Sequence, residues 1–175
     1  MGAPKGLLDA GGAPLVVRHV EAATAVARRV VVVVGADAAR HRAALSGTRA
    51  EVVENLAWES TWPIDSLRCA LAELGEDTPT FVAPVDTPPG APATFAALIA
   101  AAGPAVPTDN DGRPGHPVLL DPETLRRVRG PAPDGLRGLL RAARRVPVED
   151  PDVARDADTP ADWAAWGVAT RRWAR

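Results

Sequence analysis

Apolar runs alternate with segments of mixed polarity along most of this chain. The run VVVVVGAD, residues 30–37, is β-branched on both faces and is interrupted by Gly35, which predicts a buried strand in a sheet covered by helices. Just before it, Ala and Val recur at helical spacing over residues 20–29, which predicts a helix. A helix followed by a buried strand is the repeating unit of an α/β protein.

The same alternation continues towards the C-terminus. Periodicity and caps predict further helices at residues 38–45, 65–74, 91–103, 121–130 and 134–145, and a last helix from 159 onward. Apolar runs predict strands at residues 50–55, 80–86, 104–108, 116–120 and 146–150. We therefore expect one α/β domain over residues 1–175, a Rossmann-like three-layer fold with a mostly parallel sheet. Its ligands should bind at the carboxyl ends of the strands.

Composition narrows the class of function. The formal net charge is −2 and the basic residues are scattered, which argues against a nucleic-acid partner. No run approaches the roughly 18 apolar residues of a membrane span, and we expect no membrane partner and no signal peptide. The single cysteine, Cys69, has no partner for an internal disulfide and is expected in the core. These features predict a cytoplasmic protein.

Lys5 and a few aspartates are the candidate chemical groups. Lys5 is the only lysine among 20 basic residues, and a compact ammonium suits a phosphate oxygen. Asp86 ends a predicted strand, where a carboxylate can hold Mg²⁺ together with substrate phosphates. The segment DADTPAD adds Asp156, Asp158 and Asp162. For each acidic group the alternative is an ordinary helix cap, and for Lys5 it is a solvated charge.

His116 lies between a turn and a predicted strand, and a structural role is the default for a lone histidine. The sequence contains no Walker loop, no dinucleotide-binding glycine fingerprint and no nucleophile elbow. Hydrolase and dehydrogenase functions are therefore disfavoured.

Taken in order, eight segments carry a family resemblance: MGAPKGLL, GGAPLV, VVVVVGAD, VENLAW, SLRCAL, APVDTPP, GRPGHPVLL and DADTPADW. The chain resembles the MobA-like NTP transferases, and among them the molybdenum cofactor cytidylyltransferases. The resemblance implies a Mg²⁺-dependent nucleotidyltransferase that joins CMP, or another nucleoside monophosphate, from CTP or a related triphosphate to a phosphorylated acceptor such as molybdopterin, with release of pyrophosphate.

The resemblance also implies roles for individual residues. Lys5, Asp86 and Asp158 match catalytic positions, with Asp86 and Asp158 as metal ligands and Asp156 beside them. The nucleotide-binding positions are Gly2, Pro4, Lys5, Asn55 and Ser66. The acceptor-binding positions are Gly115, His116 and Pro117.

Departures from the family pattern leave alternatives open. In the family, a first strand and a loop L-A-A-G-x-S-x-R precede the segment that matches Met1, so we expect the sheet to lack its usual first strand. We also expect the sequence as given to be poorly stable and inactive, with its start placed one segment too late. The spacing from Asn55 to Ser66 is one residue longer than in the family pattern. The segment PAPDGLRGLL matches the family's G-D-x-G-x-R loop only weakly. The alternatives are a non-catalytic binding module and a transferase for a sugar or alcohol phosphate.

Overall fold

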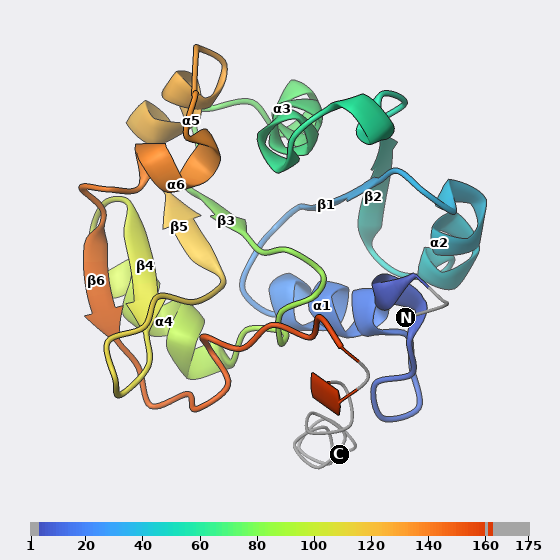
Figure 1. The fold of residues 1–175 in the computed structure, drawn as a ribbon, viewed down its shortest axis with the longest axis horizontal. Coiled ribbons are helices and arrows are strands. Elements are labelled where there is room, and N and C mark those ends of the chain that lie inside the picture. The colour runs from blue at the N-terminus through green and yellow to red at the C-terminus, as the bar shows by residue number, and fades with distance from the viewer. Residues whose placement is uncertain (1–3, 160, 163–175) are drawn as a thin grey trace.

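The computed structural model describes residues 4–159 and 161–162. Helices alternate with strands along the chain, as the apolar pattern predicts (Figure 1). The α-helices are α1 (Leu15–Thr24), α2 (Ala38–Leu45), α3 (Pro63–Leu74), α4 (Pro92–Ala100), α5 (Pro122–Val128) and α6 (Gly135–Leu139), with single 3₁₀ turns η1 (Lys5–Leu7) and η2 (Trp58–Ser60). The strands are β1 (Val30–Val34), β2 (Ala50–Glu54), β3 (Thr80–Val82), β4 (Ala105–Thr108), β5 (Val118–Leu120) and β6 (Arg144–Pro147).

The strands form two separate sheets among the described residues. The parallel pair β1–β2 is one sheet, and the other has the order β3–β5–β4–β6. In the second sheet β4 and β6 are parallel, whereas β5 runs antiparallel to both of its neighbours. The sheets are therefore parallel and mixed, and no described strand lies between β1 and β3. This agrees with the expected α/β class.

Helices cover both faces of the larger sheet, which gives three layers. Val106, Val118 and Leu120 point to one face and pack with residues of α3, α5 and α6. Ala105 and Leu119 point to the other face and pack against Leu98 of α4. Neighbouring residues of one strand enter different cores because their side chains alternate between the faces. None of the described helices is long and apolar enough to cross a bilayer.

Several element boundaries differ from the sequence prediction. Helix α1 begins at Leu15, after Pro14, and ends at Thr24, whereas the prediction placed the helix at residues 20–29. The apolar segment Leu15–Val17 thus belongs to the helix, and Pro14 supplies its N-terminal boundary. Strand β3 ends at Val82, so that Asp86 lies in a loop. Strand β6 begins at Arg144 because its register follows β4, which pairs Ala105 with Arg144. Most of the predicted last helix lies outside the described residues.

Candidate active site

Lys5 lies between two carboxylates that are distant in sequence. Its Nζ donates to Asp86 Oδ2 at 3.1 Å and to Asp158 Oδ1 at 2.6 Å, across 81 and 153 positions of the chain. The side chain of Asp158 is 70% exposed and those of Lys5 and Asp86 about one-third. Ion pairs this exposed contribute little to stability. The cluster is therefore a charged surface site rather than part of the core.

Local structure explains how the three groups meet. Lys5 begins η1, and the next residue, Gly6, packs so closely that an added Cβ would lie 3.3 Å from Val85. The Asp86 carbonyl accepts a hydrogen bond from the Ala157 amide at 2.8 Å. This backbone contact joins the loop after β3 to the segment that carries Asp156 and Asp158. The site is thus assembled by backbone packing, with the charged side chains added at its surface.

His19 supports the Asp86 loop from beneath. The helix face that holds Leu15 and Val16 also carries His19, whose Nε2 lies 2.9 Å from the Thr87 carbonyl oxygen. Burial lowers the pKa of His19 to about 4, against smaller opposing effects of the Thr87 and Val85 carbonyls and of Asp86. The ring is therefore neutral near pH 7, with Nε2–H as the donor to Thr87. The sequence prediction missed His19 because it began the helix at residue 20; with the correct start, spacing from Leu15 places His19 on the buried face.

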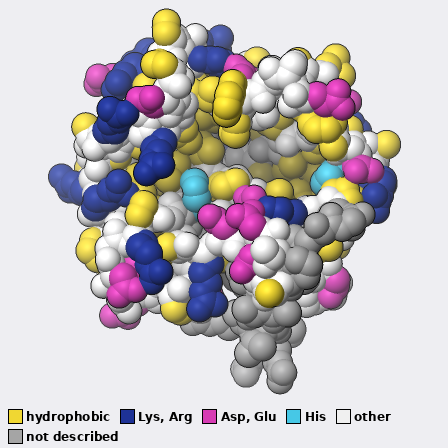
Figure 2. All heavy atoms as spheres, in the orientation of Figure 1, with side chains coloured by type: hydrophobic (Ala, Val, Ile, Leu, Met, Phe, Trp, Pro, Cys, Tyr) yellow, Lys and Arg dark blue, Asp and Glu magenta, His cyan; other side chains and the backbone are white. Residues whose placement is uncertain are grey.

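Electrostatics favour a cation at the cluster. Partial desolvation and the neighbouring Asp86 raise the pKa of Asp156. The two carboxylates that Lys5 contacts raise the pKa of Lys5, and its hydrogen bond to Asp158 is the largest effect. Figure 2 shows acidic side chains beside a central hollow, with a basic side chain next to them. Lys5 thus occupies, as a monovalent counter-ion, the position between the carboxylates.

The donor set fits a hydrated divalent cation. Asp86 Oδ2 and Asp158 Oδ1 contact the same nitrogen, so they lie within about 6 Å of each other, a span that one Mg²⁺ bridges with the help of a water ligand. Among the described residues, no group of three or more His, Cys, Asp or Glu side chains has the arrangement of a protein-only metal site. Mg²⁺ is commonly held by one or two carboxylates and completed by water and substrate phosphates, which matches this arrangement.

Asn55 and Ser66 also lie in contact, but their side chains are hydrogen-bonded to each other within the protein. Asn55 follows β2, and its Nδ2 donates to Thr61 Oγ1 at 3.0 Å and to Ser66 Oγ at 3.2 Å. Its Oδ1 accepts from the Ala57 amide at 3.1 Å. Both amide hydrogens of Asn55 are therefore used by Thr61 and by Ser66 of α3, and a nucleotide-binding role for Asn55 and Ser66 stays a prediction. Pro4 precedes η1, and Gly2 lies outside the described residues.

The segment Gly115–Pro117 packs against the segment that leads to Asp156. The Gly115 amide donates to the Pro107 carbonyl at 2.9 Å and the His116 amide to the Val153 carbonyl at 3.0 Å. A Cβ on Gly115 would collide with the Val153 carbonyl, so glycine is required there. Burial lowers the pKa of His116, and its Nδ1 is buried without a hydrogen-bond partner among the described residues. The neutral ring thus keeps one nitrogen unpaired inside the protein, and the acceptor role of the segment stays a prediction.

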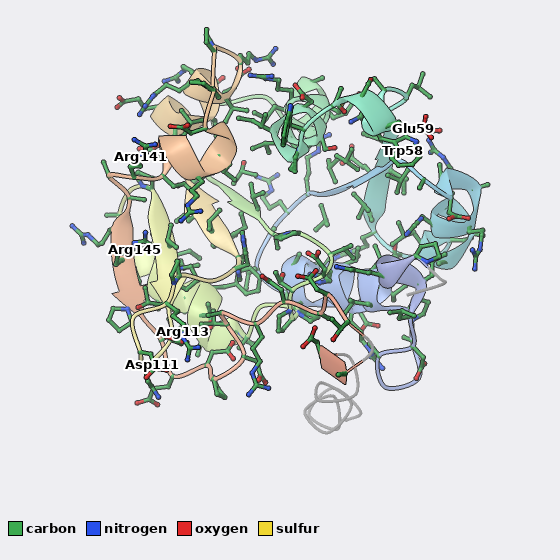
Figure 3. The ribbon with its side chains drawn as sticks, in the orientation of Figure 1. Trp58, Glu59, Asp111, Arg113, Arg141 and Arg145 are labelled. Atoms are coloured by element: carbon green, nitrogen blue, oxygen red, sulfur yellow. The ribbon has the colours of Figure 1, made fainter. Side chains whose placement is uncertain are left out.

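A cleft of about 2800 Å³ lies next to this cluster, lined by residues of β1, β3, α1 and α3 and by Gly115 and His116. Val85 lines it directly before Asp86. Figure 3 shows Trp58 near β1 and β2, across the molecule from Arg141 and Arg145, and all three residues line the cleft. Sequence reasoning overlooked this aromatic and basic lining. The two tryptophans of the polar loop AWESTW were the available signal.

Solved structures of nucleotidyltransferases share the overall fold of this chain. A nucleotidyl transferase from Methanothermobacter superposes with a TM-score of 0.80 at 23% identity, covering 97% of this chain and 86% of that one. Rv0371c from Mycobacterium tuberculosis, in a complex with manganese, superposes with a TM-score of 0.74 at 27% identity, covering 94% and 91%. A 2-C-methyl-D-erythritol 4-phosphate cytidylyltransferase from Thermus thermophilus gives 0.72 at 20%, covering 97% and 95%.

No curated protein matches the chain. The family comparison, in contrast, covers most of it, because residues 1–148 match the MobA-like NTP transferase domain. That match takes in Lys5, Asp86 and the segment Gly115–Pro117, whereas Asp156 and Asp158 follow it. Because this match covers most of the chain and the fold is that of solved nucleotidyl transferases, the chain belongs to the MobA-like NTP transferase family and is a nucleotidyltransferase.

Proposed function

We propose that this protein uses Mg²⁺ to transfer CMP from CTP to the phosphate of a molybdopterin-like acceptor, with release of pyrophosphate. The observation that carries the proposal is the convergence of Lys5, Asp86 and Asp158 beside the cleft. The reaction forms a bond between an acceptor phosphate oxygen and the α-phosphorus of CTP. It breaks the bond from that phosphorus to the bridging oxygen, which leaves with the electron pair as pyrophosphate.

The chain supplies position and charge for this reaction. Asp86 and Asp158 would hold the metal ion, with Asp156 beside them, and the bound ion would neutralise phosphate charge. Lys5 would release its two carboxylates and place its ammonium on the triphosphate, because a flexible stem lets a point charge move between oxygens. Oriented charge is the main requirement of phosphoryl and nucleotidyl transfer, which asks for little covalent participation by the protein.

One segment would bind the nucleotide and another would bind the acceptor. Asn55 donates a hydrogen bond to Ser66 of α3, which lines the cleft and would contact the nucleotide. Gly115, His116 and Pro117 also line the cleft and would contact the acceptor, with the neutral ring of His116 donating or accepting one hydrogen bond. The manganese in the Rv0371c structure supports a divalent metal, since that protein is 27% identical to this chain.

The proposal is tested with purified protein extended at its N-terminus by the first strand and the loop L-A-A-G-x-S-x-R of the family, with Mg²⁺ or Mn²⁺, each of the four nucleoside triphosphates labelled at the α-phosphate, and a panel of acceptors. Molybdopterin and a sugar-alcohol phosphate are the two informative acceptors. We expect labelled CMP–molybdopterin and equimolar pyrophosphate. Asp86→Asn should remove both, whereas Asp111→Asn, which changes an exposed loop carboxylate paired with Arg113, should leave turnover unchanged. Turnover with the sugar-alcohol phosphate alone would replace the acceptor in the proposal.

A non-catalytic binding module is the remaining alternative, and the same samples distinguish it. Such a module would bind nucleotide and metal in a calorimetric titration but give no labelled product with any acceptor. Product formation that depends on Asp86 rules it out.

A further inference from the structure

We propose that Arg137, Arg141 and Arg145 form a binding site for a second oxyanion of the acceptor, on the side of the cleft away from Lys5. This site, which rests on the proposed function, narrows the acceptor class to small molecules with two anionic groups. All three arginines are exposed and line the cleft. Figure 2 shows basic side chains on the side of the central hollow where α6 and β6 lie, with a histidine between them and the acidic side chains.

Two elements bring these side chains to one face of the larger sheet. Arg145 of β6 is paired in register with Val106 of β4, and Val106 packs in the core that α6 covers. Paired residues of neighbouring strands point to the same face, so Arg145 points towards the α6 side of the sheet. Arg137 lies in α6 and Arg141 follows its end, four positions later, a spacing that puts two side chains on the same side of a helical turn. Figure 3 shows Arg141 and Arg145 on the same side of the molecule.

Carboxylates neutralise only part of this positive charge. Arg141 forms an ion pair with Asp134, and the two side chains are 73% and 58% exposed. Within residues 4–159 and 161–162, Arg137 and Arg145 form no ion pair and their side chains make no hydrogen bond. Their guanidinium groups therefore have free donors, and the planar fork of arginine matches the oxygens of a phosphate or a carboxylate.

The position of β6 separates this site from the open edge of β3. The sheet order is β3–β5–β4–β6, so β6 and β3 are opposite edges with two strands between them. Helix α6 packs on the same sheet through Leu136 and Leu140, which contact the core that contains Val106. The arginines are therefore held by packed elements of the larger sheet and do not depend on what lies beside β3.

His116 gives the spacing between the two charged ends of the cleft. Burial lowers the pKa of His116, while the charges of Asp156 and Asp86 oppose this effect, so the ring lies close to the acidic cluster. His116 precedes β5, which is two strands from β6, and at about 4.8 Å per strand the arginines lie roughly 10 Å beyond it. Val118 lines the cleft on this path. The site therefore suits an acceptor with its reacting phosphate at one end, an apolar middle and an oxyanion at the other end.

The first test measures binding without metal or nucleotide, so it does not depend on transferase activity. Octyl phosphate and neutral octanol are titrated calorimetrically into the N-terminally extended protein of the transfer assay. We expect octyl phosphate to bind about tenfold or more tightly than octanol, because hydrogen bonds to its charged head are charge-assisted. The same titration with octanoate shows whether the site prefers a phosphate or a carboxylate.

Substitutions locate the bound anion. Arg145→Gln should weaken octyl phosphate binding about tenfold, and Arg145→Lys should restore only part of the affinity, because an ammonium lacks the planar fork. Arg127→Gln is the matched control, since it removes an exposed charge of α5 that does not line the cleft, and it should leave the affinity unchanged. Lys5→Met should leave it unchanged as well.

The second test compares octyl phosphate and 1,8-octanediol bisphosphate as acceptors of CMP from CTP. In either case one phosphate oxygen attacks the α-phosphorus and pyrophosphate leaves, but only the bisphosphate keeps a second anion for the arginines. We expect its kcat/KM to be about tenfold higher. Arg145→Gln should remove this advantage and leave kcat/KM for octyl phosphate unchanged. If neither acceptor is turned over, the proposed function fails, while weaker octyl phosphate binding in Arg145→Gln still supports the anion site.

Three outcomes would overturn the anion site. One is equal octyl phosphate affinity in Arg145→Gln and the parent. Another is an equal loss of affinity in Arg127→Gln, which would reduce the effect to net charge. The third is a loss in Lys5→Met but not in Arg145→Gln, which would place the phosphate at the catalytic cluster.

Discussion

Acidification should destabilise this protein through His19. In the folded state burial lowers the pKa of His19 to about 4, compared with 6.5 for an unperturbed histidine. Between these two values the unfolded chain binds a proton that the folded protein excludes. The stability associated with the neutral ring is therefore complete above pH 6.5, falls with decreasing pH, and is lost below pH 4. The pKa difference corresponds to about 3 kcal/mol in total, of which about 2 kcal/mol is lost by pH 5.

Urea unfolding followed by tryptophan fluorescence at pH 7 and pH 5 measures this loss. His19→Gln is the informative variant, because its amide can still donate to the Thr87 carbonyl but does not titrate. It should therefore lose about 2 kcal/mol less than the parent between the two pH values. His116 also has a lowered pKa, so the comparison with the variant, rather than the parent alone, isolates His19.

His41→Gln is the matched control, since His41 lies on the outer helix α2 and its ring is partly exposed. This variant should keep the pH dependence of the parent. Equal pH dependence in the parent and in His19→Gln would refute the inference that a neutral, buried His19 supports the Asp86 loop.

Further predictions concern the charged cluster and its supports. In the same N-terminally extended protein, Asp86→Asn should reduce nucleotidyl transfer by about 100-fold or more and change Tm by less than about 2 °C, as measured by pyrophosphate release and calorimetry, because the carboxylate is partly exposed and adds little to the core. In protein extended by the first strand and loop of the family, Lys5→Ala should slow transfer substantially and Lys5→Arg should restore only part of it; equal rates in all three extended proteins would make Lys5 a spectator. In the absence of nucleotide, Lys5→Met should bind Mn²⁺ on the order of tenfold more tightly in a titration followed by electron paramagnetic resonance, because the ammonium no longer competes for the carboxylates. Gly115→Ala should lower the free energy of unfolding by about 2 kcal/mol or more in urea, since its methyl group would overlap the Val153 carbonyl, whereas Gly130→Ala, whose methyl group would make only an ordinary contact, should cost less.

The order of elements could be read from the sequence because it depends on local chemistry. Alternating helical and β-branched runs predicted the α/β class, the bounds of α2 and the position of β2 to within a residue. The helix predicted at residues 121–130 begins at an Asp cap, since the Asp121 carboxylate accepts the Thr124 amide at 2.9 Å. Such local signals persist in the folded protein because residues close in sequence supply both partners of each contact.

Contacts between distant residues required the tertiary structure. Lys5 meets Asp158 only because the chain returns to it after 153 positions, and the Ala157–Asp86 backbone bond that aligns them has no local sequence signal. The start of β6 was wrong in the prediction because pairing with β4, rather than its own residues, sets its register. Local propensity cannot encode a partner that the rest of the chain must first place.

Strand β1 depends both on its local sequence and on the tertiary structure. Its five valines by themselves determined that this segment is a strand suited to burial on both faces. Only the tertiary structure decided that β2 covers one edge while the other faces the cleft, because edge pairing depends on which strands the intervening helices bring alongside.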